Sequence, residues 1–553
     1  MREPTIDRGL SIRKTKRKPS ISAIGLVLAI LFVLLIAAVP IITEKGYQKQ
    51  PENVAGISYF MHSPIYIDGN SGFTNASGVV WGSGTPQDPY IIENWEINAA
   101  TAHGIHIANT TAYFIVRNCY VYGGGSDYNG IHLYNCTHGV LDKNNCSNNQ
   151  YGGIYLSGSN NNSISNNTCC SNDLWGIILV DSNNNCISNN TCSNNDCGIG
   201  LFSSNNNSIS NNNCSNNQYV GIYLLRSSNN SISNNNCSFS ENWYGIYLRR
   251  DSNGNDIRNN TCSNNGFGIY LESSSNENIV SDNICSNNSA GIRFFRSSRN
   301  SINDNICSNN DYGIYLEGSN SNSIRNNNCS SNKDNGIDLE ESNNNIISNN
   351  NCSNNQRDGI NLLLSTSNII SDNTCCLNDW NGIFIGDISN NNSIRNNTCC
   401  SNNNYGIYFS YCSNSNIISD NTISDNNRYG IALESDSNFN RIWNNSFYNN
   451  NGATSVYDPS HIQAYDNGTG NLWNTSGTPH GFGNYWSDWT SPDTNMDGIV
   501  DNPYVIDGSA HAKDYYPLTQ FPYIPEFSSM LIPIAFTLLA VILISYIRRN
   551  RER

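Results

Sequence analysis

Residues 153–175 read GIYLSGSNNNSISNNTCCSNDLW, and this stretch decides the fold. Ile154 and Leu156 are separated by one residue, which is the period of a β-strand. Two further short apolar segments surround Ile164 and Cys169, and each lasts only a few residues. Asn, Ser and Gly fill the intervals, and Asn favours turns because it tolerates left-handed backbone conformations and bonds its own main chain. The stretch therefore predicts three short strands joined by turns, and no helix.

The opening phrase of this stretch, Gly-Ile-x-Leu or a close variant, recurs along the chain every 22 to 26 residues. A period of this length indicates a repeat architecture, in which each unit buries its apolar side chains only by stacking on its neighbours. The copies begin at Gly104, Gly130, Gly153, Gly176, Gly198, Gly221, Gly245, Gly268, Gly291, Gly313, Gly336, Gly359, Gly382, Gly406 and Gly430.

Four apolar columns run through the repeats: the Ile and Leu of the phrase, a repeated cysteine, and an aliphatic residue five positions before that cysteine. We predict an all-β, single-stranded parallel β-helix over residues 101–447, with about 14–15 coils and three short strands per coil. Asn residues at matching corners should form hydrogen-bonded ladders between coils. A leucine-rich repeat has a similar period, but it requires an L-x-x-L-x-L spacing that the sequence does not show. Residues 43–100 and 448–523 lack the repeat and are expected to cap the two open ends.

Both ends of the chain carry membrane-like sequence. Residues 21–42 contain no charge after a basic tail at 1–20, and residues 527–547 contain none before a basic tail at 548–553. Each run is long enough to span a bilayer, and the basic flanks should remain in the cytoplasm. We therefore expect a membrane-anchored protein with its repeats outside the cell. The first run could instead be a cleaved signal peptide.

The formal net charge is −15, although both tails are basic, so the segment between them is strongly acidic. Such a surface repels phosphate backbones, and we expect no nucleic-acid partner. It suits a high-salt or divalent-cation environment, and it also simply keeps the protein in solution.

Several segments resemble the NosD-like group of right-handed β-helix proteins, whose repeats are of a carbohydrate-binding and sugar-hydrolysis type. The resemblance rests on the entry segment at 64–97, the coil phrases YGIYL and NNSISNN, and the exit segments at 483–508 and 514–519. It implies a right-handed helix, and the group's name implies assembly of a copper site. The tetrapeptide IPEF at 524–527, followed by an apolar run and a basic end, resembles the sorting tail of some archaeal surface proteins. This chain is similar to anchored archaeal relatives, for which no copper role is implied.

One short motif predicts a metal. Oxygen ligands at Asp493, Asn495, Asp497 and Asp501, with Gly498 between them, match a calcium loop in which the Ile499 carbonyl would also bind. The position of the closing glutamate is occupied by Tyr504, so Asp507 or Asp514 would have to complete the shell. The alternative is an Asp-Gly turn without metal. We expect a structural Ca²⁺ at this loop and no organic cofactor.

The repeat cysteines most simply pack as small hydrophobic side chains in the interior. Thiolate ladders also suit soft metals such as Cu(I), but such sites normally combine close cysteine pairs with histidines, which the coils between His138 and His461 lack. Adjacent pairs such as Cys375-Cys376 should point one sulfur inward and one outward, so disulfides remain a further alternative. The column comprises Cys119, Cys146, Cys169, Cys192, Cys214, Cys237, Cys262, Cys285, Cys307, Cys329, Cys352, Cys375 and Cys399.

Aromatic residues follow two outward tracks that could stack on the sugars of a polysaccharide. The alternative is that the rings stack only on each other and cover the coil surface. One track lies directly before the phrase Gly and includes Trp175, Tyr244, Phe267, Tyr312, Tyr405 and Tyr429. The other is the x of the phrase, and its candidate ligand-binding residues are Tyr155, Tyr223, Tyr247, Tyr270, Tyr315 and Tyr408, with Phe384.

Weak candidates for catalysis lie beside these tracks. Glu317 and Glu340 each follow a repeat Leu one coil apart, at a spacing compatible with the carboxylate pair of a retaining glycosidase. Asp338 and Arg293 lie on the same face, and charges on a solvated surface are the simpler interpretation. We therefore expect a non-catalytic module that binds polysaccharide or surface glycan. A polysaccharide lyase or glycoside hydrolase is the first alternative, and copper-site maturation is the second.

Overall fold

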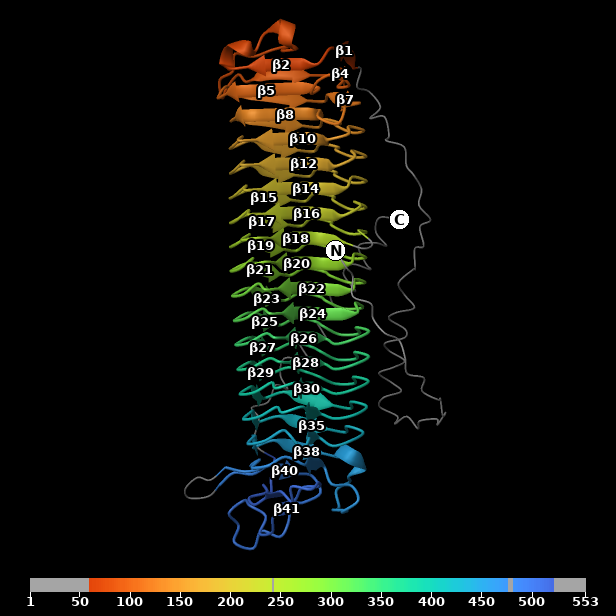
Figure 1. Ribbon diagram of the computed structural model, residues 1–553, viewed down its shortest axis with the longest axis vertical. Coiled ribbons are helices and arrows are strands. Elements are labelled where there is room, and N and C mark those ends of the chain that lie inside the picture. The colour runs from red at the N-terminus through yellow and green to blue at the C-terminus, as the bar shows by residue number, and fades with distance from the viewer. Residues whose placement is uncertain (1–58, 241–242, 476–480, 522–553) are drawn as a thin grey trace, which may run out of the picture. The chain divides into compact units, whose positions relative to one another are not determined.

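The computed structural model describes residues 59–240, 243–475 and 481–521. They form a parallel β-helix whose coils stack in chain order (Figure 1). The predicted tails and apolar runs at 1–20, 21–42, 527–547 and 548–553 lie outside these residues. Within the described residues, no helix is long and apolar enough to cross a membrane.

The first side of the helix is built from the Gly-Ile-x-Leu phrases. Its strands pair in parallel and in register from one coil to the next, so that Ile154 faces Ile177 and Leu156 faces Leu179. In order they are β2 (Ile65–Asp68), β5 (Ile105–Thr110), β8 (Asn129–Cys136), β10 (Gly152–Ser157), β12 (Trp175–Val180), β14 (Cys197–Phe202), β16 (Val220–Leu225), β18 (Tyr244–Arg249), β20 (Phe267–Glu272), β22 (Ala290–Phe295), β24 (Tyr312–Glu317), β26 (Ile337–Glu340), β28 (Ile360–Leu363), β30 (Ile383–Gly386), β33 (Ile407–Phe409), β36 (Ile431–Leu433) and β39 (Ala464–Asp466).

The second side is a 16-stranded sheet in which most strands have three residues. The central residue of each three-residue strand is the aliphatic residue that lies five positions before the repeat cysteine. The strands are β3 (Tyr90–Glu93), β6 (Phe114–Arg117), β9 (Gly139–Asp142), β11 (Ser163–Ser165), β13 (Cys186–Ser188), β15 (Ser208–Ser210), β17 (Ser231–Ser233), β19 (Asp256–Arg258), β21 (Ile279–Ser281), β23 (Ser301–Asn303), β25 (Ser323–Arg325), β27 (Ile346–Ser348), β29 (Ile369–Ser371), β31 (Ser393–Arg395), β34 (Ile417–Ser419) and β37 (Arg441–Trp443).

The third side differs from the prediction of three strands per coil. In the middle coils it is reduced to single bridges, such as the one between Thr168 and Thr191, because corners close on both sides of it. Asn166 and Ser171 adopt left-handed backbone conformations, with φ of 57° and 55°, and leave only four residues between them. In the described part of the chain, this side has true strands only toward its ends: β1 (Phe60–His62), β4 (Trp95–Asn98) and β7 (Tyr120–Tyr122), then β32 (Thr398–Cys400), β35 (Thr422–Ser424), β38 (Ser446–Tyr448) and β40 (Tyr485–Trp486).

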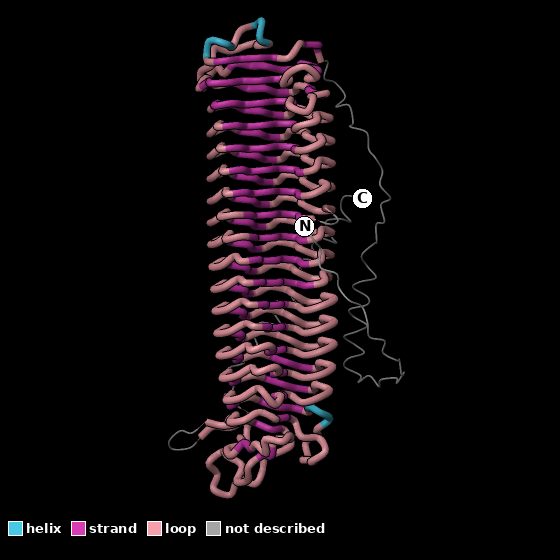
Figure 2. The backbone as a smooth tube through the Cα atoms, viewed as in Figure 1, coloured by secondary structure: helices cyan, strands magenta, loops and turns pink. Residues whose placement is uncertain are grey.

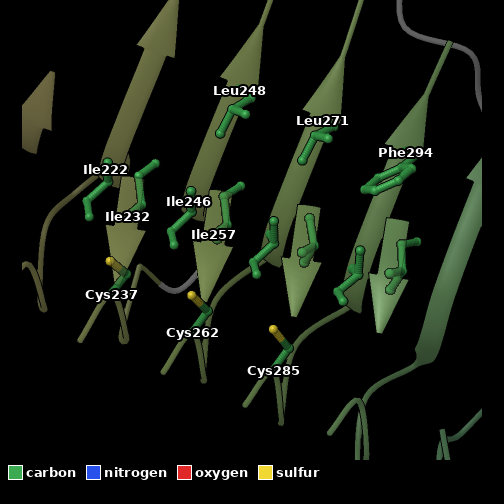
Figure 3. Packing of buried hydrophobic residues seen from close by; sticks show 14 of the residues in the cluster. Ile222, Ile232, Cys237, Ile246, Leu248, Ile257, Cys262, Leu271, Cys285 and Phe294 are labelled. Atoms are coloured by element: carbon green, nitrogen blue, oxygen red, sulfur yellow. The ribbon is translucent and has the colours of Figure 1, made fainter. Parts of the chain in front are cut away.

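The interior contains the four predicted apolar columns. The side chains of Ile246, Leu248, Ile257 and Cys262 come from one coil, have no solvent exposure, and lie level with their equivalents in neighbouring coils (Figure 3). The phrase glycines are needed because the backbones of successive coils approach closely here. A Cβ at Gly245 would lie 2.6 Å from the carbonyl oxygen of Gly268.

Both ends extend the helix beyond the predicted repeats. Residues 65–98, predicted as part of a cap, contribute strands to the first coil, so the helix has about 16 coils rather than 14–15. The connection after β2 holds two short 3-10 helices, η1 (Asn70–Gly72) and η2 (Asn75–Ser77), coloured cyan in Figure 2. The ring of Phe73 in this connection lies 5.6 Å from that of Phe114.

At the other end, aromatic rings close the core after η3 (Asn450–Gly452). Trp486 stacks between Phe447, at 4.2 Å, and Tyr504, at 4.0 Å, and all three rings are fully buried. The strands β41 (Tyr504–Val505) and β42 (Lys513–Asp514) complete this segment.

Three ladders of buried asparagines run along the corners, as predicted. In each, the backbone N–H and usually the side-chain amide donate to the side-chain oxygen of the equivalent residue one coil further on; from Asn167 to Asn190 these distances are 2.9 and 3.0 Å. All three ladders point the same way, and each ends on a buried aspartate. The first runs through Asn445 and Asn484 to Asp514, the second through Asn440 and Asn471 to Asp466, and the third through Asn450 and Gln463 to Asp488.

Candidate functional site

The outward-facing residue at the centre of each first-side strand defines one continuous column, here called the outer column. Parallel register places each member directly beside the next. In chain order the column is Tyr66, His106, His132, Tyr155, Ile178, Gly200, Tyr223, Tyr247, Tyr270, Arg293, Tyr315, Asp338, Asn361, Phe384, Tyr408, Ala432 and Tyr465.

The residue before each phrase Gly forms a second, flanking column. In its C-terminal half this column reads Tyr244, Phe267, Ala290, Tyr312, Asn335, Asp358, Asn381, Tyr405 and Tyr429.

The aromatic residues of the two columns stack on one another. Tyr247 lies 4.3 Å from Tyr244 and 5.2 Å from Tyr270, and Tyr405 lies 4.6 Å from Tyr408. Ring-on-ring packing of this kind was the alternative to sugar binding, and it accounts for Tyr247 and for Tyr270, whose side chain is buried. The candidate tyrosines therefore share one face but do not form a single open track.

Over two successive coils neither aromatic column carries a ring, and a groove of about 520 Å³ opens there. In the outer column Asp338 and Asn361 replace two rings, and in the flanking column Asn335, Asp358 and Asn381 replace three. Since short polar side chains leave space where rings would stand, the interruption produces the hollow. Aromatic walls remain around it: Tyr312, Tyr315, Trp380, Phe384, Tyr405, Tyr408 and Tyr411.

Buried carboxyl groups form the floor of this groove. The Asp338 side chain is 7% exposed and accepts from the amides of Asn335, at 2.9 Å, and Asn361, at 2.8 Å. Asp358 is 4% exposed and accepts from the Asn381 amide at 2.8 Å. Burial raises the pKa of Asp338 to about 7 and that of Asp358 to about 6, because neither carboxylate has enough compensating charge nearby.

Two arginines lie at the groove. Arg357 pairs with Asp334 at 3.2 Å and stacks over Trp380 at 4.6 Å, and Arg428 donates to the Tyr405 hydroxyl at 3.1 Å. Each is held by partners and still contributes to the lining. The groove thus combines ring faces, cationic groups and protonatable carboxyls.

The weak catalytic candidates separate into two groups. Asp338 and Glu340 line the groove, and Glu340 accepts a hydrogen bond from the Tyr315 hydroxyl at 2.7 Å. Glu317 is the register neighbour of Glu340, as predicted, but it is paired with Arg293 at 2.8 Å and lies outside the groove lining.

The sequence analysis did not identify Asp358 or Trp380. It also did not identify the three asparagines Asn335, Asn361 and Asn381. The signal was present in the aligned repeats, as the positions where an aromatic column loses its rings. A larger hollow, of about 830 Å³, is lined by residues between Ser171 and Phe239 and by Trp243, but its carboxylates Asp173 and Asp196 are not buried. Buried groups with shifted pKa values in a concave, partly apolar site favour the smaller groove as the functional one.

The predicted metal loop is a hydrogen-bonded turn in the structure. Asp493 accepts from the N–H of Gly498 at 3.1 Å, Asp497 from that of Ile499 at 2.9 Å, and Asp501 from the Thr494 hydroxyl at 2.7 Å. Asn495 donates to Asp497 at 3.0 Å. These bonds are compatible with a turn alone, and calcium at this loop stays a prediction.

The interior cysteine column is fully buried, as expected for packing. Burial disfavours the thiolate that binds metals and raises the pKa of Cys119 to about 12, whereas hydrogen bonds from neighbouring thiols lower the pKa of alternate members such as Cys214. Of the adjacent pairs, the second cysteines Cys376 and Cys400 meet in a disulfide across neighbouring coils, while Cys375 and Cys399 remain in the interior.

A different group of nitrogen donors gathers near the start of the helix. His103, His106 and His132 each offer a donor atom within 4.8 Å of the others, and across the described residues they are the only such group of three or more His, Cys, Asp or Glu. Burial lowers the pKa of His103 to about 4 and of His132 to about 3. The rings are therefore neutral at physiological pH.

Comparison with known families agrees with the fold. Residues 103–261 match the family described as right handed beta helix region, and residues 249–358 and 331–491 match the family described as periplasmic copper-binding protein (NosD). The chain is a right-handed parallel β-helix repeat protein. No curated protein matches it.

Among solved structures, the chain is similar to several β-helix proteins at low identity. The periplasmic alginate epimerase AlgG is 15% identical, with 65% of this chain and 84% of that chain covered and a TM-score of 0.28. The A-module of mannuronan C-5 epimerase AlgE6 from Azotobacter vinelandii is 14% identical, with 68% and 92% covered and a TM-score of 0.28. The Dettilon tailspike protein is 14% identical, with 57% and 62% covered and a TM-score of 0.32. Similarity at this level concerns the fold and carries no argument about substrates.

Proposed function

We propose that this chain is an extracellular β-helix protein that binds polysaccharide or surface glycan in the groove at Asp338 and Asp358. The observation that carries the proposal is the loss of rings from both aromatic columns in two successive coils, at Asn335 and Asp338 and at Asp358 and Asn361. Around Tyr247 and Tyr270 the rings cover one another, whereas at the groove Trp380, Tyr405 and Tyr408 border an open space.

The groove has the length and the chemistry for a short stretch of glycan. Four coil steps separate Tyr315 from Tyr408, which at the ~4.8 Å spacing of stacked strands is about 19 Å. Aromatic faces suit the apolar faces of sugar rings, and the amides, hydroxyls and arginines suit their hydroxyl groups. A protonated Asp338 can also donate a hydrogen bond, which a carboxylate cannot.

The binding proposal is tested by screening the purified protein on a glycan array and measuring affinities of the hits by calorimetry. Trp380→Ala and Tyr405→Ala should each weaken binding by about 10-fold, since buried aromatic contacts are worth roughly 1 kcal/mol or more. Tyr223→Ala, which removes an equivalent ring of the same face outside the groove, is the matched control and should change affinity less than about twofold. An empty array, or equal losses in all three variants, would contradict the proposal.

A lyase or glycoside hydrolase is the second candidate, and the raised pKa values of Asp338 and Asp358 favour it specifically. A group that titrates near neutral pH can serve as general acid or base, and such groups concentrate at active sites. Incubation with a panel of neutral and uronic-acid polysaccharides should then give new reducing ends or unsaturated products, which Asp338→Ala should abolish. If the protein binds glycans but converts none of them, the enzymatic candidate is wrong and the non-catalytic binding function stands.

Anchoring in the cytoplasmic membrane is part of the proposal and is supported by the apolar runs at 21–42 and 527–547, each with a basic flank. Membrane fractionation and protease accessibility of the groove in intact cells test it. Recovery of the full-length chain in the cytosolic fraction would contradict it. Copper maturation through the cysteine column has weaker support, because those sulfurs are buried.

A further inference from the structure

The histidine group lies on the same face as the groove, near the opposite end of the helix. His106 in β5 and His132 in β8 are consecutive members of the outer column, and their ring centres are 4.7 Å apart. His103 precedes β5 and reaches the same place from the side, with its ring 4.6 Å from that of His132. Three imidazoles from two neighbouring coils therefore converge at one position.

His132 is the central and least satisfied member of the group. Both of its ring nitrogens are buried and neither has a hydrogen-bond partner. A buried polar group without a hydrogen-bond partner is rare in native proteins because its lost hydration is not replaced, so such a ring indicates a ligand. Tyr155 stacks flat on the ring, with 4.7 Å between centres, and fixes its plane.

The geometry points to a binding site for a divalent transition metal, formed by His103, His106 and His132. Neutral imidazole is a preferred ligand of Zn²⁺ and Cu²⁺, and three of them leave one coordination position open. Donor atoms within 4.8 Å of one another need only modest side-chain rotation to reach the ~3.4 Å separation that Zn–N bonds of about 2.1 Å imply for a tetrahedron. Hard cations such as Ca²⁺ prefer oxygen ligands and should not bind here.

The three histidines should not contribute equally. The Nδ1 atom of His103 already accepts the backbone N–H of Asn129 at 3.0 Å, and this bond fixes which nitrogen of the neutral ring carries the proton. Metal binding by His103 therefore requires that bond to be released or the ring to turn. We expect His132 to be the strongest ligand and His103 the weakest.

The inference of this metal site does not rest on the match to the copper-binding protein family. The residues matched to that family begin at 249, beyond all three histidines. It is also independent of glycan binding, because it shares no residue with the groove lining.

The experiment titrates untagged, metal-free protein with Zn²⁺ or Cu²⁺ by calorimetry and follows thermal unfolding in parallel. We expect one ion per chain, and a stabilisation of about 2.7 kcal/mol at 100-fold excess over Kd. Electron paramagnetic resonance of the Cu²⁺ form should show coupling to imidazole nitrogen. Ca²⁺ prefers oxygen ligands, so any heat or thermal shift that it gives at the loop of Asp493, Asp497 and Asp501 should be the same in wild type and in His132→Tyr.

Two variants and one control decide the assignment. His132→Tyr introduces at this outer-column position the residue type that the neighbouring coil has at Tyr155, so the fold should be kept. The variant should weaken metal binding at least about 100-fold. If that variant does not fold, His106→Gln serves instead. His461→Ala, a histidine outside the group, should bind normally. Absence of stoichiometric binding, or equal binding by wild type and the cluster variants, would overturn the inference.

Discussion

Two regions of the outer column, the histidine group at His106 and His132 and the groove at Asp338 and Asn361, differ in chemistry but share their construction. In both, polar or ionisable residues occupy outer-column positions that tyrosines occupy in coils such as those of Tyr223 and Tyr247. Beneath both, the interior consists of the same columns of Ile, Leu and Cys with no solvent exposure. The comparison shows that the stacking interior tolerates different exteriors, so that chemistry can be changed coil by coil without a change of fold.

The largest effects should arise from the shared interior. Leu133→Ala, beneath the histidines, and Leu339→Ala, beneath the groove, each remove a fully buried member of the same column. Each should lower the free energy of unfolding by about 2–5 kcal/mol, measured by urea denaturation followed by circular dichroism. A difference between the two variants of more than about 2 kcal/mol would break the comparison, because the interior would then not be equivalent.

Refilling the groove should have the next largest effect. Asn361→Tyr would restore a ring to the outer column between Tyr315 and Phe384 and occupy the space above Asp338. Glycan affinity should fall at least about 100-fold, or about 2.7 kcal/mol, in the calorimetric assay. Ile178→Tyr, at a non-aromatic column position outside the groove, is the control and should leave affinity unchanged. Retention of binding by Asn361→Tyr would place the glycan elsewhere.

The two regions should respond to pH in opposite directions. The buried carboxyls of Asp338 and Asp358 have raised pKa values, so their contribution to stability is greatest below the ordinary aspartate pKa and is lost as pH rises through about 6 to 7. The histidines have lowered pKa values, so their contribution is present above the ordinary histidine pKa and is lost as pH falls toward about 4.

Unfolding free energies between pH 4 and pH 8 test this contrast. Relative to wild type, the double variant Asp338→Ala/Asp358→Ala should gain at least about 1 kcal/mol as pH rises, and His132→Tyr should lose a similar amount. Parallel curves for wild type and both variants would contradict the assigned protonation states.

The smallest effect on glycan affinity is expected from a substitution just outside the edge of the groove. Glu317→Gln breaks a partly exposed pair with Arg293 outside the groove, so it should change glycan affinity less than about twofold and stability by less than about 1 kcal/mol. Glu340→Gln, one coil further and inside the groove, should weaken binding several-fold. Equal effects of the two variants on affinity would extend the site over the Arg293 coil.

Much of the fold followed from the sequence because each interior column repeats one residue type at one spacing. The third side could not be predicted in detail, since it depends on left-handed corners at residues such as Asn166 and Ser171, which shorten it to a bridge. The first coil was not predicted because residues 65–98 lack the Gly-Ile-x-Leu phrase. Only the pairing of β2 with β5 and of β3 with β6 shows that these residues belong to the helix.

The candidate sites were less predictable, for a physical reason. Asp338 and Glu340 were found as charges on the outer face, whereas the groove itself is an absence of rings, and its depth depends on neighbours such as Trp380. His103 stands in the flanking column, directly before Gly104, and His106 and His132 stand in the outer column, so the group becomes visible only when both columns are aligned together. Residue spacing places these residues in register, but it does not show that their ring nitrogens converge.

The asparagine ladders give the stack a polarity. In each ladder the backbone N–H and, in most coils, one side-chain amide hydrogen point toward the C-terminal end, while the second amide hydrogen often bonds a main-chain carbonyl of the preceding coil. The aligned N–H groups along the ladder leave a partial positive charge at the C-terminal end, as at the N-terminus of an α-helix. Asp466, Asp488 and Asp514 meet that charge and take up the last free hydrogens. The three aspartates close the ladders: without them the final coil would present unpaired N–H groups, which are a template for further pairing like those of an open sheet edge.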